Sequence, residues 1–126
     1  MKEFMLFIRK QNEHENEMSS EQHQAFLKGC MDYIAILKKE GKLKSAQPIE
    51  RKGIIISNAD KNWKEVPFNE TKEVIGGYYH ILAKDIDEAI AIAKENPEFK
   101  FSTNARIEVR PIKMKEESTQ YVYPTK

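Results

Sequence analysis

The sequence predicts an α+β domain in which two helices cover one face of a four-stranded antiparallel sheet. Short segments with the apolar patterns of strands are separated by two longer segments whose apolar residues recur every three or four positions, as in helices. Their order along the chain is strand, helix, strand, hairpin, strand, helix, strand. With 126 residues, the chain is long enough for one domain with its own core and too short for two ordinary domains.

Overall charge, cysteine content and hydropathy exclude several classes of protein. The 21 Lys and Arg nearly balance the 20 Asp and Glu, so the net charge of +1 creates no field that would attract nucleic acid or anionic lipid. The single cysteine excludes an internal disulfide and a multi-cysteine zinc site. The N-terminal apolar run is shorter than the ~7 to 15 residues of a signal peptide, and no segment approaches the ~20 of a membrane span. We therefore expect a cytoplasmic protein without nucleic-acid, membrane, metal or cofactor binding.

The first strand is predicted over residues 3–9 and the first helix after Ser19. The strand segment is rich in aliphatic and aromatic residues, as expected where both faces are covered. Ser19 and Gln22 have the spacing of a capping box, and Gly41 supplies the left-handed residue that ends a helix. The apolar stripe of this helix consists of Phe26, Leu27, Cys30, Tyr33, Ile34 and Leu37.

The middle of the chain is predicted to be extended. Residues 42–50 are extended, and residues 53–57 and 63–68 flank the turn-rich segment NADKN, which indicates a β-hairpin. A double glycine then leads into a strand over residues 78–83. One face of this strand carries Tyr78, His80 and Leu82, and the other carries Tyr79, Ile81 and Ala83.

The last predicted elements are a second helix and a final strand. Asp85 and Glu88 have capping-box spacing at the start of the helix, and Pro97 marks its end. The buried stripe of this helix is predicted to consist of Ile86, Ala89, Ile90 and Ala93. Residues 106–114 alternate apolar and charged side chains, which is typical of a strand with one buried face.

With right-handed crossovers, these elements form the ferredoxin-like βαββαβ arrangement with an inserted β-hairpin. We place this domain at residues 1–114 and a polar tail at residues 115–126. The sheet face without helices would carry Met5, Phe7 and either Tyr79 or Tyr78, an apolar surface that monomers rarely expose. We expect a homodimer to cover it, with the segment Tyr121-Val122-Tyr123 lying across the partner as an arm.

Spaced motifs fill the second half of the chain. Residues 67–97 read PFNETKEVIGGYYHILAKDIDEAIAIAKENP, and IEVRPI follows. These motifs resemble the YCII-related family, in particular the branch known for a DGPF motif, whose members read approximately DGPFxETKExxGGYY, then a D-x-DEA helix, then IEVRP. KKEGKL and SAQP also fit, so the resemblance spans Phe4 to about Met114. It implies a ferredoxin-like domain that pairs into a dimeric α/β barrel, and it implies no single established activity.

The chain departs from the family pattern at two places. Glu65-Val66 stands where the motif has Asp-Gly, so a carboxylate is kept and a flexible glycine is lost. Some YCII-like proteins carry a histidine in the first helix that is thought to form a catalytic pair with an aspartate. Counting back from the SAQP motif, the matching position here is Cys30, which weakens the case for an enzyme.

His80 is the leading candidate for a catalytic residue. On a central strand beside two tyrosines, it could act as a general base near neutral pH, in proton abstraction or elimination. The structural alternative is a histidine packed against the first helix or hydrogen-bonded to a tyrosine. His23 is a candidate ligand-binding residue, because the first turn of its helix would face the mouth of the barrel.

Arg9, Glu108 and Arg110 form a second constellation. If the last strand pairs with the first, these side chains meet on one face, where two guanidinium groups beside one carboxylate could hold an organic acid. The alternative, which we favour, is a cross-strand ion network that stabilises the sheet.

Two functions remain open. In the first, the dimeric barrel binds a small aromatic or acidic organic molecule, with or without turnover. The residues expected around this molecule are Arg9, Tyr78, Tyr79, His80, Glu108, Arg110 and His23. In the second, the protein is a non-catalytic regulatory or protein-interaction module, which agrees with a cysteine in place of the family's histidine.

Overall fold

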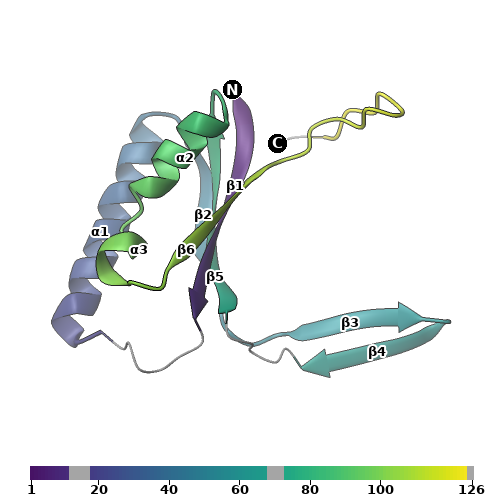
Figure 1. The fold of residues 1–126 in the computed structure, drawn as a ribbon, viewed down its shortest axis with the longest axis horizontal. Coiled ribbons are helices and arrows are strands. Elements are labelled where there is room, and N and C mark those ends of the chain that lie inside the picture. The colour runs from purple at the N-terminus through teal and green to yellow at the C-terminus, as the bar shows by residue number, and fades with distance from the viewer. Residues whose placement is uncertain (12–17, 68–72, 125–126) are drawn as a thin grey trace.

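A computed structural model describes residues 1–11, 18–67 and 73–124, and it shows a four-stranded antiparallel sheet with helices on one face (Figure 1). The strand order is β2 (Leu43–Pro48), β5 (Glu73–Ala83), β1 (Lys2–Gln11) and β6 (Arg106–Pro111). The helices are α1 (Ser20–Lys39), α2 (Ile86–Lys94) and the short α3 (Glu98–Phe101). Strands β3 (Ile54–Ala59) and β4 (Asn62–Pro67) form a separate hairpin. This is the predicted ferredoxin-like arrangement with its inserted hairpin.

The hydrophobic core lies between the sheet and the helices. Alternate residues of β1 and β5 point into it, together with residues of α1 and α2; the central ones are Phe4, Leu6, Ile8, Tyr33, Leu37, Tyr79, Ile81, Ala83, Ala89, Ile92 and Ala93. Leu6 and Ile81 are fully buried. The alternation along β5 is the one predicted, so His80 and its neighbours at every second position lie on the face without helices.

Both ends of α1 are formed as predicted. The Ser19 side chain accepts from the backbone N–H of Gln22, and the Gln22 side chain accepts from the backbone N–H of Ser19. Gly41 has φ of +70°, a conformation that L side chains rarely adopt, and its N–H bonds the carbonyl of Lys38. The expected stripe is buried only in part, because Leu27 is 46% exposed.

The second helical region differs from the prediction in three ways. The Asp85 side chain accepts from the N–H of Glu88, but the Glu88 carboxylate accepts from the N–H of Lys84 and not of Asp85. Ile86 and Ile90 are 40% and 37% exposed, and Ile92 is buried instead. Pro97 does follow α2, but it also precedes α3, a one-turn helix that was not predicted.

The open face, defined here as the sheet face without helices, carries two cross-strand rows of side chains. In one row, Phe7 of β1 lies between Tyr78 of β5 and Glu108 of β6. In the other, Met5 lies between His80 and Arg110. Both rows therefore place apolar residues at the centre and polar or charged residues around them.

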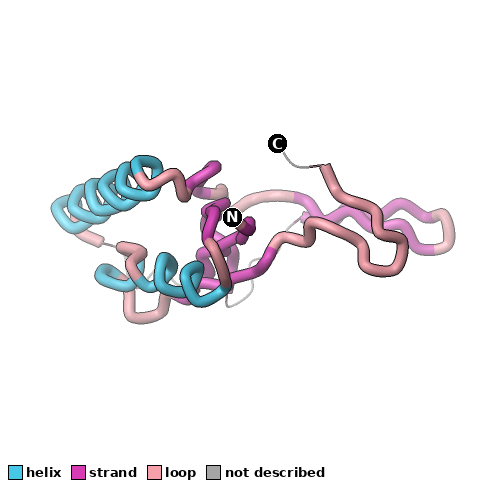
Figure 2. The backbone as a smooth tube through the Cα atoms, turned by 90° about the horizontal axis from the view of Figure 1, so that it is seen from above, coloured by secondary structure: helices cyan, strands magenta, loops and turns pink. Residues whose placement is uncertain are grey.

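Two segments project from the domain on the side of the open face, away from the helices (Figures 1 and 2). One is the β3–β4 hairpin, whose two-residue turn, Asp60-Lys61, has positive φ angles as hairpin turns require. The other is the chain after β6, which folds back on itself through a bridge between Lys115 and Val122. The expected second hairpin strand included Phe68, which lies outside the described residues. No helix in the described parts of the chain has the length and apolar character that a membrane crossing requires.

Candidate functional site

His80 belongs to a charged cluster on the open face. Its Nε2 atom lies 2.7 Å from Oε1 of Glu3, and Nζ of Lys44 lies 3.4 Å from the same oxygen. The side chains of Glu3 and His80 are only 11% and 23% exposed. The structural alternative for His80 was packing against the first helix or a hydrogen bond to a tyrosine hydroxyl. The structure shows a contact with the carboxylate of Glu3 instead.

The cluster favours the ionised form of Glu3 and orients the ring of His80. Burial of Glu3 works to raise its pKa, but the hydrogen bonds from His80 and Lys44 and their charges outweigh it and hold the pKa below its usual value. An ionised carboxylate at Nε2 requires the proton on that nitrogen. Nδ1 is then the ring nitrogen that can accept a proton in neutral His80, which is the arrangement of a histidine base oriented by an acid.

Arg9, Glu108 and Arg110 also meet on the open face. Nη1 of Arg9 lies 2.6 Å from one carboxylate oxygen of Glu108, and Nη1 of Arg110 lies 3.0 Å from the other. The hydrogen bonds from Arg110 and Arg9 lower the pKa of Glu108. Since Glu108 engages both guanidinium groups, the geometry is that of the cross-strand ion network.

A cavity of about 220 Å³ lies between α1 and the sheet, on the helix side. Phe26, Leu27 and Cys30 of α1 and Tyr78 and Tyr79 of β5 border it. We call it the α1 cavity. Its lining is mostly apolar and includes Cys30.

An ion pair between half-buried Lys10 and buried Glu98 forms the polar side of the α1 cavity. Nζ of Lys10 lies 3.2 Å from Oε2 of Glu98, whose side chain is 8% exposed, and 5.4 Å from the centre of the Phe26 ring. A buried charge is usually paired with an opposite charge, as it is here. Lys10 and Glu98 thus provide a fixed cation and anion beside an apolar space.

Cys30 and Tyr79 are neutral in the α1 cavity. Burial, and then the charge of Glu98, raise the pKa of the Cys30 thiol. Burial and the neighbouring Cys30 raise the pKa of Tyr79 to about 12. A thiol with a raised pKa is a poor nucleophile, so Cys30 acts here as a small apolar side chain.

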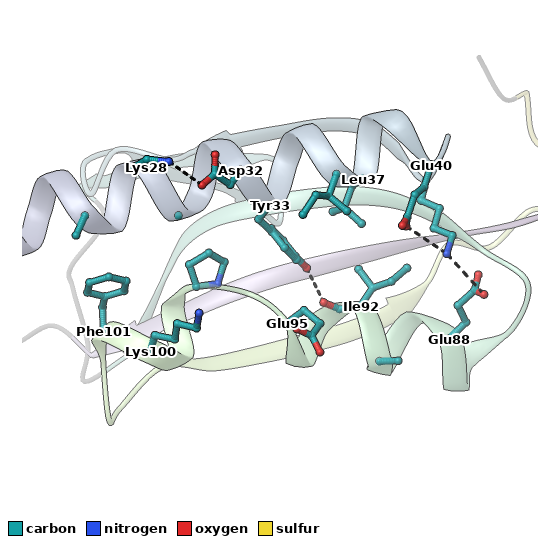
Figure 3. A pocket seen from close by; sticks show the side chains of 16 residues that line it. Lys28, Asp32, Tyr33, Leu37, Glu40, Glu88, Ile92, Glu95, Lys100 and Phe101 are labelled. Atoms are coloured by element: carbon teal, nitrogen blue, oxygen red, sulfur yellow. Dashed lines mark hydrogen bonds and ion pairs between the residues drawn. The ribbon is translucent and has the colours of Figure 1, made fainter.

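A larger groove of about 770 Å³ runs between α1 and the α2–α3 segment (Figure 3). The hydroxyl of Tyr33 crosses it and donates to the carbonyl of Ile92 at 2.6 Å. Lys28 pairs with Asp32 on its rim, and Lys42 lies between Glu40 and Glu88. We consider the α1 cavity the better candidate site, because an ion pair with a buried carboxylate lies at its edge and the predicted residue Tyr79 borders it.

The structure divides the predicted site residues between two faces of the sheet. Tyr78, His80, Arg9, Glu108 and Arg110 lie on the open face, where they form two separate clusters around Phe7 and Met5. Tyr79 does not lie with them, because its side chain is in the core on the helix side of the sheet, with its ring 5.4 Å from that of Tyr33. His23 is exposed on α1.

Four charged residues of these sites were missed. Glu3 could have been found, because it shares the alternation of Met5 and Phe7 and so the face of His80. Lys44 lies where the register of β2 against β5 shifts, and no sequence signal marks that irregularity. Lys10 and Glu98 meet only through the tertiary fold.

The described residues contain no group of three or more His, Cys, Asp or Glu side chains that could hold a metal ion. Comparison with known families gives one assignment: residues 3–113 match the family model described as "YCII-related domain". No curated protein matches the chain. The match covers every strand and helix of the domain described above.

Proposed function

The chain belongs to the YCII-related family, and we propose that it binds a small one-ring aromatic molecule in the α1 cavity. Within the family, its ETKE and GGYY motifs support the DGPF branch. The observation that carries the proposal is the cavity itself, an apolar space beside a fixed ion pair. Such a space, with few polar groups at one side, is the usual form of a small-molecule site.

The volume of the α1 cavity sets the size of the molecule. An engineered cavity of about 150 Å³ lined by apolar side chains is enough to bind benzene. At about 220 Å³, the α1 cavity therefore has room for one ring with a small substituent. Lys10 is the cation that an acidic substituent would approach, while Glu98 opposes a second negative charge.

The test is a panel of one-ring compounds, both neutral phenols and benzoates, with binding measured by protein-observed NMR. Cys30→Leu, which adds bulk to the cavity, should weaken binding by about tenfold or more, equivalent to about 1.4 kcal/mol. Cys30→Ser keeps the volume and serves as the matched control. If a compound binds the wild type and Cys30→Leu with equal affinity, its site is not the α1 cavity. If none of the compounds binds the wild type, the proposal is overturned.

We also propose that the functional unit is a homodimer whose two open faces pack on each other. The support is the apolar centre of the open face, with Met5 and Phe7 side by side between polar rows. A specific interface of ~800 Å² per partner would cover it. Sedimentation equilibrium at tens of micromolar protein should give twice the chain mass of 14.7 kDa, and a mass of 14.7 kDa would refute the dimer.

A second candidate function is proton transfer by His80 to or from an organic acid held between the two open faces. The 2.7 Å contact with Glu3 favours it, because it orients the ring and leaves Nδ1 as the base. Small carbonyl acids incubated with the protein in D₂O should exchange their α-hydrogens, as seen by proton NMR. Equal exchange with His80→Ala, or none with the wild type, would eliminate this role, and Lys113→Ala is an exposed control.

A further inference from the structure

We propose that the β3–β4 hairpin is an exchanged arm, which packs through its Trp63 face against a second copy of this chain. The proposal rests on the homodimer proposed above and goes beyond it, because the open faces could pack together with the hairpins left in solvent. It assigns an interaction surface to a segment that the α1 cavity and the His80 cluster do not use.

The hairpin has one apolar face that nothing in the described chain covers. Ile54, Ile56 and Asn58 alternate along β3 and so share one face of the hairpin. Trp63 lies directly opposite Asn58 in the pairing, so it is on that face as well. Their exposed fractions are 64%, 61% and 73%. On the opposite face, Ile55 is also 56% exposed. Contiguous apolar exposure of this kind marks an interaction surface.

A two-stranded hairpin is marginally stable at best when it packs on nothing. Both strands of this one are exposed along their whole length. Its pairing, in register from Ile54 with Pro67 to Ala59 with Asn62, therefore needs contacts that the described residues of this copy do not supply. The turn holds the two strands together, but it provides no packing for the side chains.

The direction and length of the hairpin identify a second copy as the occupant. The hairpin projects to the side that the open face looks toward, and so does the segment after β6, at the other end of the sheet (Figures 1 and 2). A partner sheet packed on the open face would lie ~10 Å away, and six residues of strand extend about 20 Å. The hairpin is therefore long enough to pass the partner sheet and contact the partner's flank.

Two-fold symmetry makes the exchange reciprocal, so each copy contributes one arm and receives one. A buried tryptophan removes roughly 150 to 250 Å² from solvent, so two of them supply a substantial share of the ~1,600 Å² of a standard interface. A second copy of the chain covers the open face and lies within reach of the hairpin at the same time. An unrelated protein would need two separate surfaces, one complementary to the open face and one complementary to the hairpin.

Trp63 reports directly on the arm, because it is the only tryptophan of the chain. In the exchanged dimer, its fluorescence should lie at short wavelength and resist quenching by acrylamide. Dilution of the full chain to monomer should move the emission to long wavelength and make the tryptophan accessible. Sedimentation on the same samples gives the assembly state independently.

A variant pair provides the control. Ile54→Glu, whose cross-strand partner is Pro67 and not Glu65, adds a charge to the Trp63 face; it should weaken the dimer by about tenfold or more and raise the quenching of Trp63. Met31→Glu makes the same kind of change at a residue of α1 that is 70% exposed, and it should leave both readouts unchanged. Neither residue is in the core, so both variants should fold.

Each outcome decides the proposal. A dimer with Trp63 shielded, and released on dilution, supports it. A dimer with Trp63 fully quenchable overturns the arm and leaves the homodimer standing, whereas a monomer with Trp63 exposed overturns both. A monomer with Trp63 shielded would show that the hairpin folds back on its own chain. Shielding of Trp63 only in the presence of another protein would show that this protein, and not a second copy of the chain, binds the hairpin. Either result overturns the proposal.

Discussion

Nε2 of His80 and Oε1 of Glu3 lie 2.7 Å apart on a sheet face that carries no helix. The folded protein stabilises the ionised form of Glu3 more than the unfolded chain does, because the pKa of Glu3 in the fold lies below the ordinary 4.5. Its contribution to stability is therefore complete above pH 4.5 and is lost as the pH falls through the lower, folded value.

Glu3→Gln should accordingly flatten the acid side of the stability profile. Urea unfolding measured from neutral pH downward should show a smaller loss of unfolding free energy below pH 4.5 in Glu3→Gln than in the wild type. Glu117→Gln, at an exposed position of the C-terminal segment, is the matched control. Parallel profiles for the wild type and Glu3→Gln would contradict the prediction.

The thiol of Cys30 should be slow to alkylate. Its raised pKa leaves less thiolate at a given pH than the ordinary pKa of 9.0 would, and burial limits access. The rate with iodoacetamide should rise with pH to a midpoint above 9.0, and a molecule bound in the α1 cavity should slow it further. Protein unfolded in urea gives the reference rate, and a folded rate equal to it would show that Cys30 is open to solvent.

Tyr33→Phe should reduce the unfolding free energy by about 1 kcal/mol, because it removes a buried hydrogen bond to the carbonyl of Ile92. The loss should not be larger, since that carbonyl also accepts from the N–H of Glu95 at 3.2 Å. Chemical denaturation measures it. Tyr121→Phe, at a residue that is 54% exposed, should change nothing, and equal effects of the two substitutions would count against the assigned bond.

Gly77→Ala should destabilise the sheet by about 1 to 3 kcal/mol, the usual cost of overpacking. A Cβ at Gly77 would lie 3.0 Å from the carbonyl oxygen of Gln47 and 3.2 Å from Cα of Pro48, two backbone atoms that cannot move aside cheaply. A Cβ at Gly76 meets only the flexible side chain of Lys10, at 3.1 Å. Thermal unfolding of both variants compares them, and an equal loss in Gly76→Ala would contradict this account.

The fold was predictable because its signals are local. The cap at Ser19, the glycine at position 41 and the alternation along β5 each depend on a few neighbouring residues, and all are formed. The errors occur where tertiary packing decides. Ile92 is buried in place of Ile90 because the position of α2 over the sheet, and not its period, selects the inward face.

The site was less predictable for a related reason. Residue types identified His80 and Arg9 as interesting, but their partners come from other strands whose register the sequence does not state. Tyr79 is next to His80 in the sequence, but adjacent strand residues point to opposite faces, so the two side chains cannot contact one molecule on the open face. The α1 cavity is bordered by three strands, α1 and Glu98 together, so no single motif could have revealed it.

The central position of β1 also sets the timing of assembly. Arg9 and its partner Glu108 are 99 positions apart, so the first strand leaves the ribosome about 5 to 20 seconds before the strand it pairs with, at ~5 to 20 residues per second. Until β5, the other strand with which β1 pairs, has also been made, the run from Phe4 to Ile8 has no partner strand and is exposed to association with other chains. The same long-range pairing predicts a slow folding step, because distant segments must meet before either is stabilised.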